Sequence, residues 1–375
     1  MTTAATVQPS KQTVEDFLPL QGIDHVEFYV GNAHQAAHFY RMLFGFNITA
    51  YRGLETGDRD KASYVLEQGK IRFVLTTALH PDSPIARHVQ LHGDGVRAIA
   101  MTVNDVDKSI EAVKSRHATI VSPAKTHEDE HGKWRSASIM AYGDTIHTFV
   151  ERKNYKGVFA PGFIPYDAPP GIPTGLAAID HMVGNVELGA MNHWVDFYAR
   201  VMGFHQLAAF TDEDISTEYS ALMSKVMENG TGKIKFPINE PAEGKKKSQI
   251  EEYLDYYHGP GVQHIAMNTG DIAATVRALR ANGIKFLRVP DSYYDALPTR
   301  IGKIDEDLAV IKELGILVDR DEDGYLLQIF TRPVEDRPTL FFEIIERHGS
   351  RGFGIGNFKA LFVSIEEEQQ KRGNL

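Results

Sequence analysis

The chain of 375 residues contains no cysteine, which excludes disulfides, thiolate nucleophiles and cysteine-ligated zinc or iron–sulfur sites. It also has no uninterrupted apolar run of membrane-spanning length, and residues 1–13 lack the basic and apolar regions of a secretory signal. The net charge of −10 argues against nonspecific binding to nucleic acid but leaves an anionic small substrate open. We therefore expect a cytoplasmic protein with no membrane and no nucleic-acid partner.

What the chain does contain is an internal repeat. The tripeptide Ile-Asp-His occurs at 23–25 and again at 179–181, each time followed by Val-Gly-Asn, Phe-Tyr and Gly-Phe. A second pair of similar segments follows at 93–101 and 259–267. A third pair is formed by 148–152 and 343–347. Self-similarity of this kind indicates two structural units of the same plan, which also suits the length of the chain.

Only the second copy keeps a set of residues able to bind a metal. The corresponding positions of the first copy are His25, Ala98 and Thr148. Those of the second copy are His181, His264 and Glu343. Two histidines and one carboxylate are the facial triad of non-haem Fe(II) oxygenases, and three repeated strands can point them into one cavity. We interpret His25, which has no partner ligands, as a structural residue.

The repeat and a proline-rich segment predict the division of the chain. We expect a disordered tail over 1–18, a first domain without metal ligands over 19–152, a Pro/Gly-rich linker over 153–177 and a catalytic domain over 178–375. Each domain should consist of two strand–helix–strand–strand–strand units. In the first domain the hydrophobic spacing predicts strands at 25–30, 63–66, 71–76 and 97–103, and helices at 36–44 and 106–117. Gly45 should end the first helix, and Asn104-Asp105 should cap the second.

One acidic segment resembles the start of a calcium-binding loop. Residues 319–324 have alternating acidic residues and glycine at the sixth position, but Phe330 stands at the twelfth, where a bidentate glutamate is required. We therefore interpret Asp323-Gly324 as the turn of a hairpin that precedes a strand at 325–330.

The end of the chain combines a glycine-rich loop with an amphipathic helix. The glycines of 352–356 do not have the spacing of a dinucleotide-binding loop, so a hinge for a lid and a plain connection both stay open. The helix that follows has an apolar face formed by Phe358, Leu361, Phe362 and Ile365.

Several amide and hydroxyl side chains lie in segments that should be buried or should face the cavity: Ser224, Asn239, Gln263 and Gln328. A buried amide without a hydrogen-bond partner costs about 1–3 kcal/mol. Substrate oxygens, ordered water or other protein groups could provide that partner, so a functional and a structural role both stay open for each residue.

Many long segments, in order along the chain, resemble the 4-hydroxyphenylpyruvate dioxygenase family of the vicinal-oxygen-chelate superfamily. They are 235–241, 247–250, 261–266, 314–321, 326–331, 336–347 and 352–358. The resemblance implies an α+β fold of the glyoxalase/bleomycin resistance/dioxygenase type. In this fold each of two domains is an open barrel of paired βαβββ modules, and a C-terminal helix gates the cavity.

The resemblance also implies the site and the reaction. Fe(II) would be bound by His181, His264 and Glu343. The residues implied to act in catalysis are Ser224, Asn239, Gln263 and Gln328. Those implied to bind substrate are Pro237, Phe330, Phe341, Asn357 and Phe358. A homo-oligomer, dimer or tetramer, would convert 4-hydroxyphenylpyruvate and O₂ to homogentisate and CO₂ in tyrosine and phenylalanine catabolism.

Other functions stay open on the same fold. A 4-hydroxymandelate synthase uses the same substrate and metal but hydroxylates the benzylic carbon. Isomerases, lyases and extradiol dioxygenases of this fold lack the long C-terminal pattern, and a noncatalytic binding protein would not need an intact ligand set. Mn, Co or Ni could also occupy such a triad.

Overall fold

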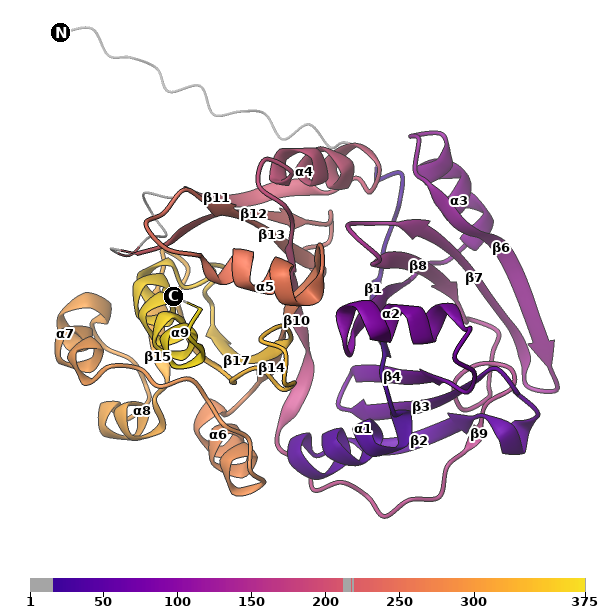
Figure 1. The fold of residues 1–375 in the computed structure, drawn as a ribbon, viewed down its shortest axis with the longest axis horizontal. Coiled ribbons are helices and arrows are strands. Elements are labelled where there is room, and N and C mark those ends of the chain that lie inside the picture. The colour runs from indigo at the N-terminus through magenta and orange to yellow at the C-terminus, as the bar shows by residue number, and fades with distance from the viewer. Residues whose placement is uncertain (1–15, 212–216, 218, 375) are drawn as a thin grey trace, which may run out of the picture.

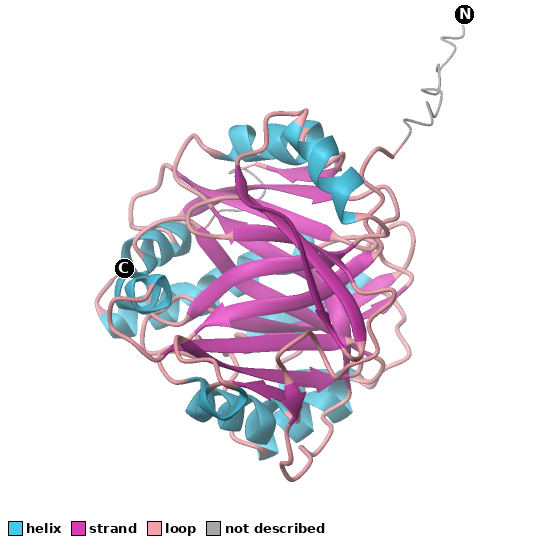
Figure 2. Cartoon of the chain, turned by 90° about the vertical axis from the view of Figure 1, so that its right-hand side faces the viewer, coloured by secondary structure: helices cyan, strands magenta, loops and turns pink. Residues whose placement is uncertain are grey.

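The computed structural model describes residues 16–211, 217 and 219–374, and it contains two large mixed sheets (Figure 1). The first sheet has nine strands in the order β6-β7-β8-β5-β1-β4-β3-β2-β9, and the second has eight in the order β11-β12-β13-β10-β14-β17-β16-β15. Each sheet comes from one half of the sequence, and the helices lie at the periphery of the molecule (Figure 2). Two mixed sheets with surrounding helices and a C-terminal helix agree with the α+β fold that the family resemblance implied.

The first half contains strands β1 (Gly22–Tyr29), β2 (Asn47–Arg52), β3 (Lys61–Gln68), β4 (Ile71–Ala78), β5 (Gly95–Thr102), β6 (Ile120–Asp129), β7 (Gly132–Met140), β8 (Ile146–Glu151) and β9 (Ile164–Pro165). Its helices are α1 (Ala33–Phe39) with a π-helical continuation (Tyr40–Phe44), the 3₁₀ turn Leu54–Thr56, α2 (Pro84–His92) and α3 (Val106–Lys114).

The second half contains strands β10 (Leu176–Asn185), β11 (His205–Phe210), β12 (Ala221–Glu228), β13 (Lys235–Ala242), β14 (Gly261–Thr269), β15 (Leu317–Arg320), β16 (Tyr325–Phe330) and β17 (Phe341–His348). Its helices are α4 (Met191–Arg200), α5 (Gln249–Tyr257), α6 (Ile272–Ala281), α7 (Asp291–Ile301), α8 (Leu308–Leu314), the 3₁₀ turn Ile355–Asn357 and α9 (Phe358–Arg372).

The predicted helix boundaries agree with the capping residues that the structure shows. Asp105 is the N-cap of α3, since its side chain accepts a hydrogen bond from the backbone N–H of Lys108. Gly45 ends the first helical segment in the left-handed conformation, with φ of 80°. The predicted hairpin at Asp323-Gly324 is also confirmed, because β15 and β16 pair antiparallel across it.

Three features were not expected from the sequence. The expected linker segment 153–177 includes the short edge strand β9, which pairs with β2 through Ile164 and Pro165. Most of the expected tail lies outside the described residues, but Leu18 is buried in the core, so ordered structure begins before residue 19. Helix α2 and strand β2 were not predicted at all.

The two halves repeat each other down to the strand register. In the first half, His25 lies opposite Ala100, which lies opposite Thr148 on the next strand. In the second half, His181 lies opposite Ala266, which lies opposite Glu343. The alignment read from the sequence is therefore also an alignment in space.

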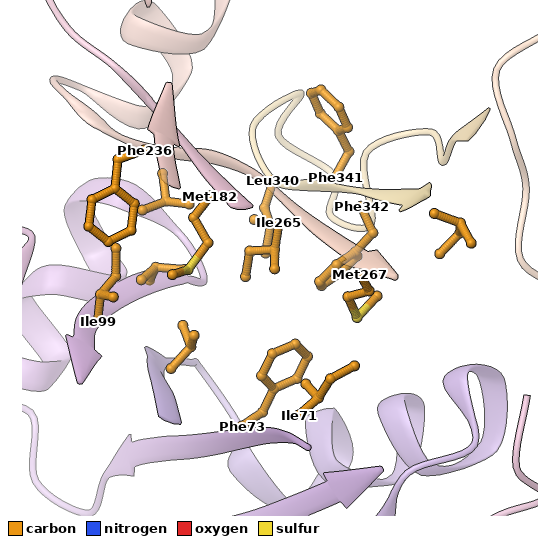
Figure 3. Packing of buried hydrophobic residues seen from close by; sticks show 14 of the residues in the cluster. Ile71, Phe73, Ile99, Met182, Phe236, Ile265, Met267, Leu340, Phe341 and Phe342 are labelled. Atoms are coloured by element: carbon orange, nitrogen blue, oxygen red, sulfur yellow. The ribbon is translucent and has the colours of Figure 1, made fainter. Parts of the chain in front are cut away.

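The two sheets pack against each other through one continuous hydrophobic core. Phe342 of the second half lies between rings of the first half, with ring centroids 4.9 Å from Phe44 and 6.1 Å from Phe73. Met182 and Ile265 point into the same core (Figure 3). Because side chains alternate between the faces of a strand, their sequence neighbours His181, His264 and Glu343 point to the opposite face. The shared core thus fixes the three strands whose other face forms the candidate site.

We expect Gly45→Ala to destabilise the protein more than Gly203→Ala, its counterpart in the repeat. Both glycines have a left-handed backbone, with φ of 80° and 72°, which costs an alanine about 1–2 kcal/mol. A Cβ at Gly45 would also lie 2.2 Å from the backbone oxygen of Ile172, whereas one at Gly203 would meet only the ring of Phe17, at 3.2 Å. Urea unfolding of the two variants measures the difference, and equal losses would contradict this explanation.

Among the described residues, no helix is both long enough and apolar enough to span a membrane.

Candidate metal centre and its cavity

Three adjacent central strands bring together the two histidines and the glutamate predicted from the second copy. The Nε2 atoms of His181 and His264 lie 3.2 and 3.5 Å from the same carboxylate oxygen of Glu343. Each of the three residues is buried, and one potential ligand atom from each lies within 4.8 Å of the others. The structure therefore converges three donors that are far apart in the sequence on one point.

The opposite ring nitrogens of both histidines are held by hydrogen-bond acceptors. His181 Nδ1 lies 2.7 Å from Asp180 Oδ1, and His264 Nδ1 lies 3.1 Å from Gln263 Oε1. If each Nδ1 carries the proton, each Nε2 directs a lone pair toward the carboxylate, an arrangement that needs a cation or a proton between them. Metal-binding histidines usually donate their other N–H in this way. The donor set therefore fits a bound metal ion.

The electrostatics of the cluster favour an ionised carboxylate. Burial alone would raise the pKa of Glu343, but when the imidazoles carry a proton on Nε2 the charge of His181 and the hydrogen bonds from both rings outweigh burial and lower this pKa to about 2. Burial lowers the pKa of His264, which favours its neutral form, whereas Glu343 and Asp180 outweigh burial at His181 and raise its pKa. A proton on His181 would therefore be displaced when a metal binds. The ionised carboxylate and the neutral imidazole are the forms that coordinate metals.

An ion pair beneath the cluster holds His181 in place. Arg347 donates two hydrogen bonds of 2.8 Å to the Asp180 carboxylate, which in turn accepts from His181. The first half has the same arrangement, with Arg152 on Asp24 at 2.6 Å and Asp24 beside His25. The supporting ion pair is thus present in both halves, whereas only the second half has the full donor set. The Asp-His pairs were visible in the sequence as part of both repeats, but their role was not recognised.

A cavity with an empty volume of about 570 Å³ opens beside the three donors. Most residues predicted to surround the substrate line it: Ser224, Pro237, Asn239, Gln263, Gln328, Phe330, Phe341 and Phe358. Other lining residues were not predicted from the sequence to surround the substrate: Val183, Phe210, Leu222, Val226, Gln249, Phe353, Leu361 and Phe362. The helical spacing of apolar residues in α9 could have indicated that Leu361 and Phe362 face the cavity. No local sequence pattern indicated this for the other residues.

Asn357 is placed differently from our expectation. It is buried but does not line the cavity; its Nδ2 donates to Gln328 Oε1 at 3.3 Å, and its Oδ1 accepts from the hydroxyl of Tyr293 at 2.7 Å. The Arg300 guanidinium donates to the same Oδ1 at 3.1 Å. Asn357 therefore touches the cavity wall only through Gln328 Oε1, and this hydrogen bond leaves the NH₂ group of Gln328 free of Asn357.

We expect Asn357→Ala to lower kcat/KM about five- to tenfold without changing the affinity for metal. The substitution removes one neutral hydrogen bond that orients Gln328, worth about 1 kcal/mol. Steady-state kinetics measures the expected loss in kcat/KM, and metal titration measures the expected unchanged affinity for metal. A normal kcat/KM would show that Gln328 needs no such support.

The acidic segment that resembled a calcium loop instead supports the glycine-rich loop above the cavity. Asp321 Oδ2 accepts from the hydroxyl of Ser350 at 2.6 Å and from the backbone N–H of Gly352 at 2.8 Å. Gly354 has φ of 73°, and a Cβ there would lie 2.0 Å from Gln328 Oε1. The glycines thus allow the backbone to approach Gln328 closely before α9 begins.

Comparison with known proteins gives the same classification. The family model of the Glyoxalase/Bleomycin resistance protein/Dioxygenase superfamily matches residues 22–138 and 178–329. The chain is 50% identical to the 4-hydroxyphenylpyruvate dioxygenase of Caenorhabditis briggsae, over 96% of this chain and 95% of that protein. For the Yarrowia lipolytica and Danio rerio proteins of the same name, identity is 46% and 49%, over 100% and 94% of this chain and 98% and 91% of those proteins.

The chain belongs to the 4-hydroxyphenylpyruvate dioxygenase family. It is accordingly a metal-dependent dioxygenase, an oxidoreductase. A solved structure of a mutant 4-hydroxymandelate synthase from Streptomyces coelicolor is also similar, with a TM-score of 0.85 and 32% identity over 94% of this chain and all of that one. The 4-hydroxyphenylpyruvate dioxygenase family thus shares its fold closely with an enzyme of a different name.

Proposed function

We propose that this chain converts 4-hydroxyphenylpyruvate and O₂ to homogentisate and CO₂, using Fe(II) bound by His181, His264 and Glu343. The reaction removes the carboxyl group of the 2-oxo acid as CO₂, hydroxylates the ring and moves the side chain to the neighbouring carbon. One oxygen atom from O₂ enters the ring hydroxyl and the other enters the new carboxylate. The observation that carries the proposal is the convergence of both Nε2 atoms on the Glu343 carboxylate beside the cavity.

The donor set supports iron as the metal. Two neutral imidazoles and one carboxylate leave coordination positions free, as in non-haem Fe(II) oxygenases. When bound, Fe(II) would supply activation of O₂ and polarisation of the 2-oxo acid.

Aromatic side chains give the cavity the shape for a phenol ring. Phe341 stacks on His264 with a centroid distance of 4.7 Å, and Phe330 meets Phe341 edge-on at 6.3 Å. Phe358 of α9 packs on Phe210 with a centroid distance of 5.2 Å and closes another side. Offset and edge-on contacts with these rings would orient the substrate ring and exclude water from it.

Polar side chains at the cavity wall would fix the angle of the substrate. Ser224 and Asn239 lie directly opposite each other on β12 and β13. Gln263 uses its Oε1 to accept from His264, so its NH₂ group can donate to a substrate oxygen. We propose that these groups, with Gln328, hold the phenol and oxo-acid ends during the reaction.

Product identification tests the proposal. 4-Hydroxyphenylpyruvate and ¹⁸O₂ are added to protein loaded anaerobically with Fe(II). The products are then separated by chromatography and identified by mass spectrometry. We expect homogentisate carrying both labelled oxygen atoms. Absence of any oxygenated product would contradict the proposal.

The similarity to 4-hydroxymandelate synthase supports a second candidate reaction. That enzyme would act on the same substrate but deliver oxygen to the benzylic carbon, so the position of the ring against Phe330 and Phe341 decides the outcome. Formation of 4-hydroxymandelate in the same experiment would favour it over the dioxygenase reaction.

The chain organisation predicted from the sequence belongs to the same proposal. We propose a first domain over 19–152, a linker over 153–177 and a catalytic domain over 178–375, in a cytoplasmic homo-oligomer. Light scattering tests the homo-oligomeric state, and cell fractionation tests the cytoplasmic location.

A further inference from the structure

A second cluster of possible metal ligands lies in the half without the catalytic donors. His88 and His92 lie one turn apart on α2, and Asp144 lies in the turn between β7 and β8. One potential ligand atom from each lies within 4.8 Å of the others. None of the three lines the cavity beside Glu343.

His88 is a buried histidine that finds no hydrogen-bond partner among the described residues. Its side chain belongs to a residue only 5% exposed, neither ring nitrogen is bonded to any of these residues, and Nδ1 lies 3.8 Å from Asp144 Oδ2. In its neutral form the imidazole has a lone pair on one ring nitrogen, which is available to a cation. A buried polar group normally has a partner, and a coordinated cation would be one.

His92 faces the same carboxylate with its Nε2 atom, while its other ring nitrogen, Nδ1, carries the proton of the neutral ring. Its Nδ1 lies 2.5 Å from the backbone oxygen of Tyr257, which can only accept, so Nδ1 carries the proton. Its Nε2 lies 3.0 Å from Asp144 Oδ2. If the ring is neutral, a lone pair of Nε2 faces a lone pair of Asp144 Oδ2, so a proton or a metal ion must lie between these two atoms. The Nδ1–H bonded to a carbonyl is the arrangement typical of a metal-binding histidine.

We propose that His88, His92 and Asp144 form a binding site for a divalent transition-metal cation of the Zn(II) type. Two histidines separated by four residues on one helix face, with a carboxylate from a second element, suit tetrahedral zinc with water as the fourth ligand. The Asp144 side chain is half-exposed, which gives the ion a path from solvent.

The site lies where the two halves meet. Tyr257, which accepts from His92 and stacks on its ring with a centroid distance of 4.4 Å, ends α5 of the second half. Gly143, beside Asp144, packs so closely that a Cβ would lie 2.3 Å from the backbone oxygen of Pro260. A bound ion would join α2 to this turn and so stabilise the contact between the halves.

Arg97 is the cationic group beside the cluster that opposes metal binding. Its guanidinium donates to the backbone oxygen of Asp144, which leaves the carboxylate to the histidines. Its charge lowers the affinity for a cation, so we expect weaker binding here than at the catalytic donors.

Anomalous diffraction at the zinc edge tests the site directly, independently of the proposed reaction. Crystals of the full chain grown with two equivalents of Zn(II) should show an anomalous peak about 2.0–2.2 Å from atoms of His88, His92 and Asp144. The absence of a peak there would overturn the proposal. A peak that appears only at millimolar Zn(II) would indicate an adventitious ion only and would overturn it as well.

A matched pair of variants tests the site in solution. With Fe(II)-loaded protein, added Zn(II) should raise the Tm of the wild type by a few degrees but raise that of Asp144→Asn less. Asp107→Asn, an exposed carboxylate of the same half paired with Arg135, should respond like the wild type. Equal Zn(II) shifts in all three proteins would overturn the proposal, and Asp144→Asn without added zinc should keep wild-type turnover.

Discussion

Replacing Glu343 by alanine is expected to lower turnover at least about a thousandfold while the protein stays folded. The substitution removes the only carboxylate of the proposed ligand set, and metal activation contributes several kcal/mol to such reactions, each 1.4 kcal/mol being about tenfold in rate. Folding should persist because the sheet is fixed through Phe342 on its other face, and the first half folds with a threonine at the equivalent position. Oxygen consumption, iron content and thermal unfolding measure the three effects.

The repeat provides the control for this experiment. Thr148 stands in the first half where Glu343 stands in the second, and its hydroxyl lies 2.9 Å from that of Ser138. Thr148→Ala should therefore keep normal iron content and turnover. Full activity of Glu343→Ala would show that the metal assignment is wrong.

Asp180→Asn is expected to weaken Fe(II) binding about 10–100-fold, the usual effect of removing a group that supports a metal ligand. Asp180 accepts from His181 Nδ1 and carries the paired charge for Arg347. The amide keeps the shape but loses the charge that orients the imidazole and raises its basicity. Breaking the buried ion pair also lowers the free energy of unfolding, by up to about 3–5 kcal/mol.

Asp24→Asn separates the effect on metal binding from the effect on stability. Asp24 makes the same contacts with His25 and Arg152, so its replacement should cost comparable stability. Because the first half lacks the other two donors, Fe(II) affinity should not change. A similar loss of Fe(II) affinity in both variants would mean that Asp180 acts only through folding.

The repeat made the centre of each sheet predictable from the sequence. Residues flanked by similar sequence in both copies, such as His25 and His181, occupy equivalent positions in the strand pairing of the two sheets. The ligands could be identified because the two copies of one strand pattern differ at two of the three ligand positions, Ala98 against His264 and Thr148 against Glu343. No local motif in either copy alone would reveal this.

Elements outside the matching sequence segments were missed for physical reasons. Strand β9 is two residues long and forms only because β2 offers an open edge, which is a tertiary effect. Helix α2 is short, but Ser83 and Pro84 at its start are a capping signal that could have been recognised. The indirect position of Asn357 depends on Tyr293 and Arg300, which are distant in sequence.

Anomalous diffraction at the iron edge, from crystals loaded anaerobically with Fe(II), tests the metal assignment directly. We expect an iron peak within bonding distance of His181 Nε2, His264 Nε2 and the Glu343 carboxylate, and no peak beside His25, Ala98 and Thr148. Iron bound at the first-half positions, or absent from the second-half triad, would contradict it.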